Sequence, residues 1–482
     1  MASTARPSTT DARRWQLWVD TGGTFTDALA CDPDGRLHRA KVLSTSRLRA
    51  RVTAVDDVGR ALRLDAPWTA RAAPDFLRGA RVGRLAQADD DDALDDLPRV
   101  TASRGARCTL DRPLGGVGGD GAGGDGDADP PAVFFAFDDE APTLAARLLT
   151  GTPADATLPP IDLRLATTRG TNALLERAGG PVALFVTAGF EDVLHIGDQR
   201  RPDLFALDVR RPAPLPARVW GVIERLDASG ETVTPLDRAR LTAQIAELAA
   251  ATDDAGRPIA AVAVALLHAY RHPAHEDAVA AALRDAGVVR HIARGAALSP
   301  TLGFLVRVET AVVDAYLAPV VAAYLARVDA ALGPGSRVHV MTSAGSLVEM
   351  DAYRPKDSLL SGPAGGVVGA VDAARALGIA RLIAFDMGGT STDVSRWAGR
   401  FDYRFAHRVG DAEIAAPALA IETVAAGGGS VCHARDGRPA VGPHSAGASP
   451  GPACYGAGGP LAITDVNLLL GRIDPTAFEI PI

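Results

Sequence analysis

Cysteine and aromatic residues are scarce in this chain of 482 residues, which has four cysteines and 5% Phe, Trp and Tyr. The cysteines, at positions 31, 108, 432 and 454, are widely separated, and no CxxC pair occurs. This spacing argues against a disulfide framework and a structural zinc site, and it is typical of reduced thiols in a cytosol. With so few aromatic side chains, we expect a core built mainly from Ala, Val and Leu.

The chain also lacks the usual signals of nucleic acid-binding, secreted and membrane proteins. Its 50 Lys and Arg against 58 Asp and Glu give a formal charge of −8, which argues against the concentrated basic face that nucleic acid requires. The polar and basic N-terminus has no apolar stretch before Trp15, unlike a secretory signal, and no run of about 18 apolar residues predicts a membrane span. We therefore expect a soluble cytoplasmic protein without a nucleic acid or membrane partner.

Apolar strands alternate with helical segments along most of the chain, which predicts an α/β fold with largely parallel sheets. Residues 1–14 are expected to form a disordered leader. Six aspartates within 87–97 and the Gly/Asp/Pro-rich segment 112–131 cannot bury enough apolar surface to fold, so a surface insertion or disordered loop is predicted there. An Ala-rich helix, or a pair of helices interrupted at Pro319, is expected over 309–332.

One octapeptide pattern, D-x-G-G-T-x-T-D, occurs twice, at residues 20–27 and 386–393. Each copy follows an apolar strand and leads back into an apolar segment, which predicts two β-hairpins. A Gly-Gly pair in such a turn allows backbone N–H groups to face a phosphate without an intervening Cβ, and the threonine hydroxyl adds a donor. Two ordinary β-turns are the alternative, which the near-identity of the copies disfavours. The chain has no GxxxxGK[ST] P-loop and no Rossmann fingerprint at Gly22 and Gly23.

Asp20 and Asp386, at the strand ends, are predicted to be catalytic and to contact Mg²⁺ or the attacking water, because a carboxylate cannot itself approach a phosphate favourably. Hairpin capping is the alternative for both. Asp27 and Asp393, which close the motifs, are expected to orient the hairpins through hydrogen bonds. The positions predicted to bind the nucleotide lie in the two motifs and in two later glycine-rich segments: Gly22, Gly23, Thr24, Thr26, Asp27, Gly388, Gly389, Thr390, Thr392, Asp393, Gly365, Gly366, Gly427, Gly428 and Gly429. For the later segments, tight interdomain turns are the alternative.

A second group of residues is predicted to bind the substrate: Thr168, Arg169, Thr171, Asn172, Arg200 and Arg201. The first four lie where a loop enters a helix, and helix capping is the alternative for Thr171 and Asn172. Arg200 and Arg201 suit a bidentate contact with a substrate carboxylate, and a solvated surface pair is their alternative. Cys454 is expected to be a small buried thiol and not a nucleophile.

Two phosphate hairpins, one near each end of a chain, are typical of the actin/Hsp70/sugar-kinase ATPase architecture, in which two related domains close on a nucleotide. The repeated motif resembles that arrangement. The resemblance implies an α/β fold with two related domains around a nucleotide cleft, with ATP and Mg²⁺ as cofactors. The expected domains are residues 15–215, with the insertion at about 87–131, and residues 216–482.

Several longer strings, in order along the chain, resemble the hydantoinase A/5-oxoprolinase family. They are ATTRGTNALLER (166–177), GFEDVLHIG (189–197), RRPDLF (200–205), LSGPAGG (360–366), DMGGTSTDV (386–394), GPACYG (451–456) and TDVNLLLGR (464–472). The resemblance implies that ATP activates a carbonyl by phosphoryl transfer to a lactam or related oxygen. The first-choice reaction is the opening of 5-oxo-proline to glutamate, and hydantoin-type rings are related substrates.

The chain departs from this family in two ways. The insertion at about 87–131 is absent from the compact family pattern, and family members continue well beyond residue 482. Ring opening in the family also needs a B-type subunit or C-terminal domain. We therefore expect the ATP-binding part of an oligomeric enzyme, truncated at its C-terminal end. The alternatives are the ATP-binding subunit of an acetone-carboxylase-type enzyme, which activates bicarbonate, and a non-catalytic actin-like nucleotide-binding module.

Overall fold

The computed structural model describes residues 14–475, with gaps. The residues outside the description are Thr24, Asp57, Arg71, 85–93, 116–131, 201–204, Ala206, 209–211, 448–449 and Ala457. The leader predicted at 1–14 therefore lies outside the described residues, except for its last one. The same holds for most of the predicted insertion.

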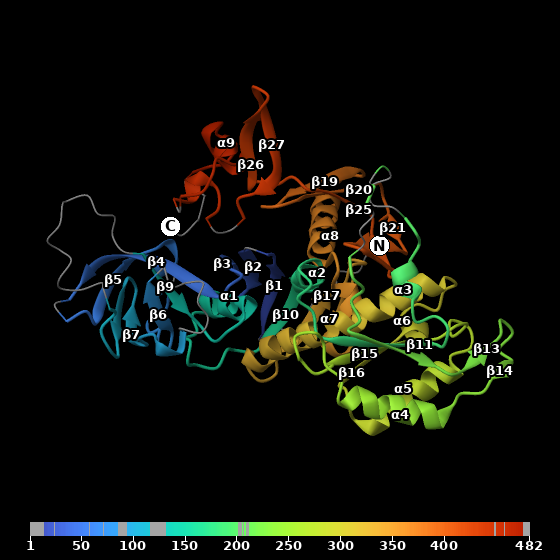
Figure 1. Ribbon diagram of the computed structural model, residues 1–482. Helices are drawn as coiled ribbons and strands as arrows, with labels where there is room; N and C mark the ends of the chain where they lie inside the picture. Colours follow the sequence, from blue (N-terminus) through green and yellow to red (C-terminus); the bar gives the residue numbers. More distant parts are fainter. Residues whose placement is uncertain are drawn as a thin grey trace.

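A six-stranded mixed sheet, in the order β18-β17-β10-β1-β2-β3, forms the centre of the molecule (Figure 1). Its strands are β1 (Trp15–Thr21), β2 (Phe25–Cys31), β3 (Leu37–Leu43), β10 (Ile161–Thr167), β17 (Arg337–Met341) and β18 (Leu347–Glu349). β1, β10 and β17 are parallel to one another, whereas β2, β3 and β18 run antiparallel to their neighbours. Because β17 and β18 join strands from the first third of the chain, the boundary predicted at 215/216 does not coincide with a boundary between sheets.

Helices pack on both faces of this sheet. They are α1 (Ala141–Thr150), α2 (Arg169–Leu175), α7 (Phe304–Ala331) and α8 (Ser361–Ala376). α1 packs against β1, β2 and β3. Leu17 and Val19 of β1 are buried with α1 in the main core, whereas Trp18 and Asp20 point to the opposite face and are accessible. The two-residue period of a strand produces this division, and it leaves the opposite face for the functional site.

α7 is one continuous helix, so of the two alternatives predicted around Pro319 the single helix is present. Pro319 cannot donate the usual helical bond to the Ala315 carbonyl. The next carbonyl, that of Tyr316, accepts a bond from the N–H of Gly180 in a neighbouring loop at 2.9 Å. By length and composition α7 could cross a membrane, but 67% of its most apolar window is buried inside the protein. In this fold it is a core helix.

A second sheet, in the order β12-β11-β15-β16, is wholly parallel, as the sequence predicts for this region. It comprises β11 (Val182–Thr187), β12 (Arg218–Val222), β15 (Ala261–Ala265) and β16 (His291–Arg294), with α4 (Arg238–Ala249) and α5 (Ala274–Ala286). The short elements α3 (Val193–Ile196), β13 (Arg225–Leu226), β14 (Thr232–Thr234) and α6 (Gly295–Leu298) complete this region. β11 and β15 are buried at every position, because the sheet is covered on both faces.

A third sheet, β6-β9-β4-β5-β8-β7, is entirely antiparallel, so the prediction of largely parallel sheets is wrong for this region. Its strands are β4 (Arg47–Val55), β5 (Ala61–Asp65), β6 (Arg81–Arg84), β7 (Val100–Arg104), β8 (Arg107–Leu110) and β9 (Ala132–Ala136), with the 3₁₀ turns η2 (Pro67–Ala70) and η4 (Leu94–Asp96). The predicted insertion is also narrower than 87–131. Leu97 and Leu114 are buried, and the Leu114 N–H bonds to the Gly59 carbonyl.

The last third of the chain holds a three-stranded antiparallel sheet, β19-β20-β25, which α8 joins to the central sheet (Figure 1). Its strands are β19 (Leu382–Met387), β20 (Thr392–Trp397) and β25 (Ile421–Val424). The smaller elements are η5 (Met350–Ala352), η6 (Pro355–Ser358), β21 (Tyr403–Arg404), β22 (His407–Val409), β23 (Ala412–Ile414), β24 (Ala418–Leu419), β26 (Ser430–Arg435), β27 (Arg438–Ser445), η7 (Ala453–Tyr455) and α9 (Ile463–Leu469).

We predict that deleting residues 118–127 leaves the melting temperature almost unchanged, because the sequence predicts a polar surface insertion there and shortening such an insertion changes its closure entropy little. Leu114→Ser is the matched comparison, because it removes a buried apolar side chain four residues before this segment. It should cost about 3 kcal/mol and lower the melting temperature clearly. Thermal unfolding followed by circular dichroism measures both variants. A deletion as damaging as Leu114→Ser would show that the segment is packed.

Candidate functional site

The two octapeptides form two hairpins with the same register, as predicted. In the β1–β2 hairpin Asp20 lies opposite Asp27, and in the β19–β20 hairpin Asp386 lies opposite Asp393. Each motif therefore begins and ends with carboxylates on neighbouring strands. The two motifs therefore share not only their sequence pattern but also the register in which their strands pair.

Backbone bonds close the two turns in the same way. The Gly22 N–H donates to the Phe25 carbonyl at 3.0 Å, and the Gly388 N–H donates to the Ser391 carbonyl at 2.9 Å. In the described part of the chain, no hydrogen bond reaches the N–H groups of Gly23, Gly389 or Thr390. These three amides are the donors that the turns leave available for an anion. Thr24, also predicted to bind phosphate, lies outside the described residues.

The second threonine of each motif holds its hairpin against the next loop. Thr26 is buried, and its hydroxyl lies 3.0 Å from that of Ser44, which in turn donates to the Gly22 carbonyl at 2.8 Å. Thr392 is also buried, and its hydroxyl donates to the Ala426 carbonyl at 2.5 Å. Both hydroxyls therefore shape the turns from within.

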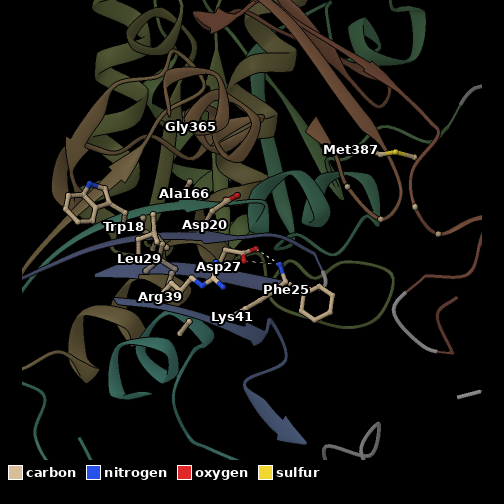
Figure 2. Close-up of a pocket in the computed structure, with 18 of the residues that line it drawn as sticks. Trp18, Asp20, Phe25, Asp27, Leu29, Arg39, Lys41, Ala166, Gly365 and Met387 are labelled. Carbon is tan, nitrogen blue, oxygen red and sulfur yellow. Dashed lines mark hydrogen bonds and ion pairs between the residues drawn. The ribbon is translucent and has the colours of Figure 1, made fainter. Parts of the chain in front are cut away.

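The two hairpins face a single cleft of about 1070 Å³. Asp20 and Asp27 line it from the first hairpin, and Gly388 and Gly389 line it from the second. Figure 2 shows Asp20 and Asp27 on one wall, with Met387 of the second hairpin across from them. Segments more than 360 positions apart in the sequence thus meet at one site.

The start of α8 approaches both strand-end carboxylates with one of its faces. A Cβ at Gly362 would lie 3.2 Å from Oδ1 of Asp20, and a Cβ at Gly366 would lie 3.7 Å from Oδ2 of Asp386. Gly365, on the same turn, lines the cleft. The absence of side chains here lets one helix approach both carboxylates.

The carboxylates influence one another. The pKa of Asp20 is raised by desolvation and by the charges of Asp27 and Asp386, while Lys41 lowers it. Asp20 lines the cleft and is accessible to water there, but the surrounding protein atoms still desolvate its carboxylate. Desolvation and the charge of Asp386 likewise raise the pKa of Asp393, against a lowering hydrogen bond from Thr423. A cation in this cleft would relieve the repulsion.

Lys41 also lines the cleft, although it was not among the predicted site residues. Its Nζ lies 2.9 and 2.8 Å from the two carboxylate oxygens of Asp27 and 4.8 Å from the centre of the Phe25 ring (Figure 2). Arg39, two residues earlier on β3, and Arg164 of β10 line the same wall. The alternation of β3 is the signal for Arg39 and Lys41, but their position depends on which strand pairs with β2. That pairing is a tertiary property.

The glycine tract 427–429 supports the second hairpin with its amides. The N–H groups of Gly428 and Gly429 donate to the carbonyls of Gly388 and Gly389, at 2.9 and 2.7 Å. The third amide of the tract, that of Gly427, bonds to Ser430 Oγ at 3.0 Å. The prediction that these three amides donate to phosphate therefore needs correction, because a protein acceptor already occupies each of them.

Gly427 has a clear steric role. A Cβ there would lie 2.6 Å from the carbonyl carbon and oxygen of Gly389 and 2.7 Å from the Thr390 nitrogen. Backbone atoms cannot move aside as a flexible side chain can, so only glycine fits at this position. Gly428 and Gly429 still line the cleft and contribute surface to it.

The predicted substrate-binding residues of α2 and its entry lie against the first hairpin. Thr168 donates through its N–H and its hydroxyl to the Thr21 carbonyl, at 2.9 and 3.2 Å. Asn172 reaches the turn itself, because its Nδ2 lies 3.5 Å from the place a Cβ would take at Gly23. The hydroxyl of Thr171 instead accepts from the N–H of Leu360, just before α8, at 3.4 Å.

The predicted arginines lie elsewhere. Arg169 stacks over the ring of Tyr324 on α7, with its guanidinium 5.5 Å from the ring centre. Arg200 forms ion pairs with Asp198 at 2.8 Å and Glu413 at 3.5 Å, and it does not line the cleft. Arg201 lies outside the described residues.

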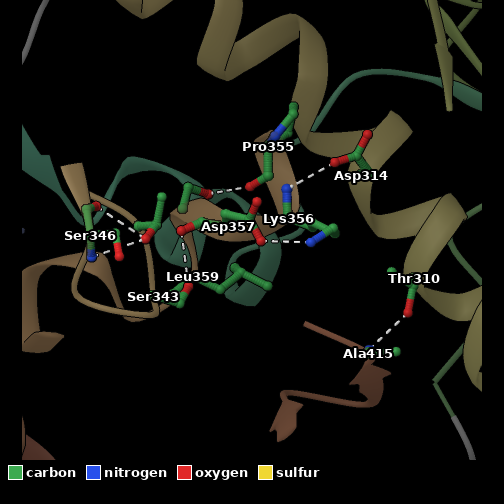
Figure 3. Close-up of polar contacts among 11 residues, drawn as sticks. Thr310, Asp314, Ser343, Ser346, Pro355, Lys356, Asp357, Leu359 and Ala415 are labelled. Atoms are coloured by element: carbon green, nitrogen blue, oxygen red, sulfur yellow. Dashed lines mark hydrogen bonds and ion pairs between the residues drawn. The ribbon is translucent and has the colours of Figure 1, made fainter. Parts of the chain in front are cut away.

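Buried polar contacts hold the approach to α8 in place (Figure 3). The N–H of Lys356 donates to Oδ1 of Asp314 on α7 at 3.0 Å, and its Nζ lies 2.6 Å from Oδ1 of Asp357. The hydroxyl of Ser343 donates to the Asp357 carbonyl at 2.9 Å. Burial raises the pKa of Asp314 to about 6. These contacts tie the segment before α8 to the core helix.

Asp465 joins the last two family-like strings. Its carboxylate accepts from the N–H groups of Ala462 and Cys454, each at 2.7 Å, which places η7 beside α9. Desolvation and the Asp465 charge raise the pKa of Cys454 to about 12. The thiol therefore stays protonated at neutral pH, in accord with the expectation that it is not a nucleophile.

Two regions of the chain match models of one protein family. Residues 147–287 match the hydantoinase/oxoprolinase N-terminal region, and residues 307–480 match hydantoinase/oxoprolinase. The 5-oxoprolinase PfmaA of Pestalotiopsis fici is 42% identical over 344 residues, which cover 65% of this chain and 26% of that protein. The chain thus spans about a quarter of the length of this relative.

Two solved structures have a similar fold. ATP-dependent caprolactamase from Pseudomonas jessenii is 27% identical, with a TM-score of 0.56 over 95% of this chain and 55% of its own. Nucleotide-free acetone carboxylase is 21% identical, with a TM-score of 0.60 over 96% of this chain and 55% of its own. The likeness to acetone carboxylase concerns the fold alone. Together these comparisons confirm a mixed α/β fold.

We predict that Asp20→Asn raises the melting temperature at pH 7, because the amide removes a carboxylate that its neighbours repel. The pKa of Asp20 is higher in the folded state than its ordinary value of 3.8, so the wild-type protein loses stability as pH rises through the folded pKa. The advantage of the variant should therefore disappear as pH falls toward 3.8. Thermal unfolding between pH 4 and 8, with the exposed Asp372→Asn of α8 as control, measures this. A variant less stable than wild type at pH 7 would contradict the idea that Asp27 and Asp386 repel the Asp20 carboxylate.

Proposed function

Because the chain belongs to the hydantoinase/oxoprolinase family, we propose that it is the ATP-handling part of an enzyme that hydrolyses a cyclic amide. The observation that carries the proposal is the pair of identically built hairpins on one cleft. The first-choice reaction converts 5-oxo-proline, ATP and water into glutamate, ADP and phosphate. The identity to a 5-oxoprolinase supports this choice.

We further propose that the fold is of the actin/Hsp70/sugar-kinase type. The sheet order β3-β2-β1-β10-β17, with an antiparallel hairpin beside three parallel strands, supports this assignment. The β19–β20 hairpin repeats the β1–β2 hairpin in the β19-β20-β25 sheet. In this interpretation the cleft between the hairpins receives the phosphates of ATP.

The free amides of the turns are suited to bind phosphate oxygens. Gly23 offers one such N–H on the first hairpin, and Gly389 and Thr390 offer two on the second. Backbone donors fixed by a closed turn need no reorganisation when negative charge develops on the transferring group. The tract 427–429 acts behind them by holding the second turn in shape.

The donor set of the cleft fits Mg²⁺. This ion is usually held by one or two carboxylates together with phosphates and water, and Asp20 and Asp386 are two carboxylates that repel each other there. Within the described residues, no group of three or more His, Cys, Asp or Glu could hold a metal, so binding would depend on the nucleotide. When bound, Mg²⁺ would supply charge neutralisation for the transferring phosphoryl group.

We assign the ring substrate to the side of the first hairpin. Asn172 lies beside Gly23 and is the predicted substrate residue nearest the turn. Thr168 and Thr171 serve as positioning residues, because their hydroxyls contact the hairpin and the start of α8. The ion pairs of Arg200 argue against a role for it in binding a substrate carboxylate.

A B-type subunit or domain, within an oligomeric enzyme, is the proposed partner. Opening a lactam needs its carbonyl oxygen held in line and water delivered to its carbon, and the cleft residues described above account only for phosphate and cation. We place the protein in the cytoplasm, in keeping with its four free cysteines.

Asp386→Ala should lower substrate-dependent ATP hydrolysis by about 100-fold or more, while the protein remains folded. The Asp386 carboxylate is exposed and supports little core. Asp372→Ala, which removes an exposed carboxylate from α8, should keep full activity. The assay measures phosphate release with the B-type part present and with 5-oxo-proline, hydantoin or bicarbonate. Bicarbonate-dependent turnover would favour the carboxylase alternative, and full activity of folded Asp386→Ala would sink the assignment.

The isolated chain should bind Mg²⁺-ATP but release little glutamate from 5-oxo-proline. Isothermal titration calorimetry with Mg²⁺ and a non-hydrolysable ATP analogue measures the first property, and a glutamate assay measures the second. Adding the B-type part should restore release by at least about tenfold. Robust release by this chain alone would show that the proposed division of labour is wrong. Failure to bind the analogue would refute nucleotide binding at the cleft.

A further inference from the structure

The β19-β20-β25 sheet repeats the strand pairing of β1, β2 and β3, but its apolar side chains are not buried in the same way. Ile383 and Phe385 of β19 stand at the same distance from the strand-end aspartate as Leu17 and Val19 of β1. Leu17 and Val19 are 0% and 4% exposed, whereas Ile383 and Phe385 are 73% and 68% exposed. The same face of the same motif is core in one copy and surface in the other.

The third strand of each sheet shows the same contrast. Val42 pairs with Thr26 in the central sheet, and Val424 pairs with Thr392 in the β19-β20-β25 sheet, so the two valines are equivalent. Val42 is 3% exposed and Val424 is 56% exposed. The exposed apolar side chains on this side of the β19-β20-β25 sheet are here called the β19 face: Ile383, Phe385 and Val424. Arg396, opposite Ile383, and Glu422, in the row of Phe385, lie on the same side.

The outer edge of β19 is also open. In the first sheet, the outer edge of β1 pairs in parallel with β10 over seven residues, from Trp15 to Thr21. β19 is at the end of its sheet, and no strand within the described residues pairs with its other edge. An open edge beside an exposed apolar face is a template for another strand.

The first copy shows what kind of segment fits such a surface. There the apolar face is covered by α1, and the chain then continues directly into β10, which pairs with the edge. One helix thus covers the apolar face, and the parallel strand that follows it pairs with the strand edge. α9 does not play this part in the second copy, because it packs against β26 and η7.

We propose that the β19 face and the open edge of β19 bind a helix–strand unit, whose strand runs parallel to β19, from polypeptide outside these 482 residues. The two solved relatives have such polypeptide, since each has 45% of its chain beyond the region shared with this one. A second copy of this chain fits less well. Two β19 edges related by a twofold axis pair antiparallel and bring no helix to the apolar face. The proposal does not depend on nucleotide binding.

Site-specific photo-cross-linking tests the proposal in the native assembly. Phe385, and separately Ile383, is replaced by p-benzoylphenylalanine in the tagged full chain, expressed in its own host and purified without denaturant. Both positions are exposed, so the replacements should not disturb folding. Leu37, an exposed leucine of β3, is the control position. After irradiation, mass spectrometry should place the adducts of 385 and 383 on one helix–strand segment outside residues 1–482, with none from position 37.

Hydrogen exchange provides a second measurement on unmodified protein. Amides of 382–387 should exchange at least tenfold more slowly in the native assembly than in the isolated chain. Cross-links only to an isotope-labelled second copy would replace the proposal with a homodimer. Absence of adducts at both positions, or unchanged exchange of β19 in the assembly, would overturn it. None of these outcomes involves ATP, so they are separable from failure of the proposed activity.

Discussion

The cleft depends on one constraint, which is the close approach of one side of α8 to two carboxylates. Gly362 meets Asp20 and Gly366 meets Asp386 from the same side of the helix, because four residues bring the chain round one turn. A Cβ at Gly362 would be tight against Asp20, whereas a Cβ at Gly366 would make ordinary contact with Asp386. The charge of Asp386 acts on Asp20 at this place, and the bond from Lys356 to Asp314 ties the segment before α8 to the core helix. Such repulsion between carboxylates is common where a protein must receive a cation or a polyanion.

The features that sequence predicted well are those encoded within a few residues. The octapeptides specified both hairpins, since a Gly-Gly turn between apolar strands is a local signal, and buried strands such as β11 followed from their continuous apolar runs. Cys454, expected to be a buried thiol, is only partly buried. The sequence left open whether one helix or two span Pro319, because the packing around α7 comes from segments far away in the chain, such as Gly180.

The remaining errors share that origin. Lys41 belongs to the site through the pairing of β3 with β2, and no motif marks it. The tract 427–429 has the composition of a phosphate loop, yet its amides are occupied by the second hairpin, which composition cannot reveal. Arg200 stands in a family-like string but meets acidic partners away from the cleft. Local chemistry therefore located the site, and long-range pairing decided which groups serve it.

The contacts of the glycine tract have a mechanical consequence. Gly428 and Gly429 are fixed to the second turn, and the Thr464 N–H fixes α9 to Gly428 at 2.8 Å. The second hairpin, the tract and α9 are consequently linked by a chain of backbone hydrogen bonds. Thr168 and Tyr324 fix the first hairpin to α2 and α7 in the same way. A change in the shape of either turn would therefore break hydrogen bonds to a neighbouring segment.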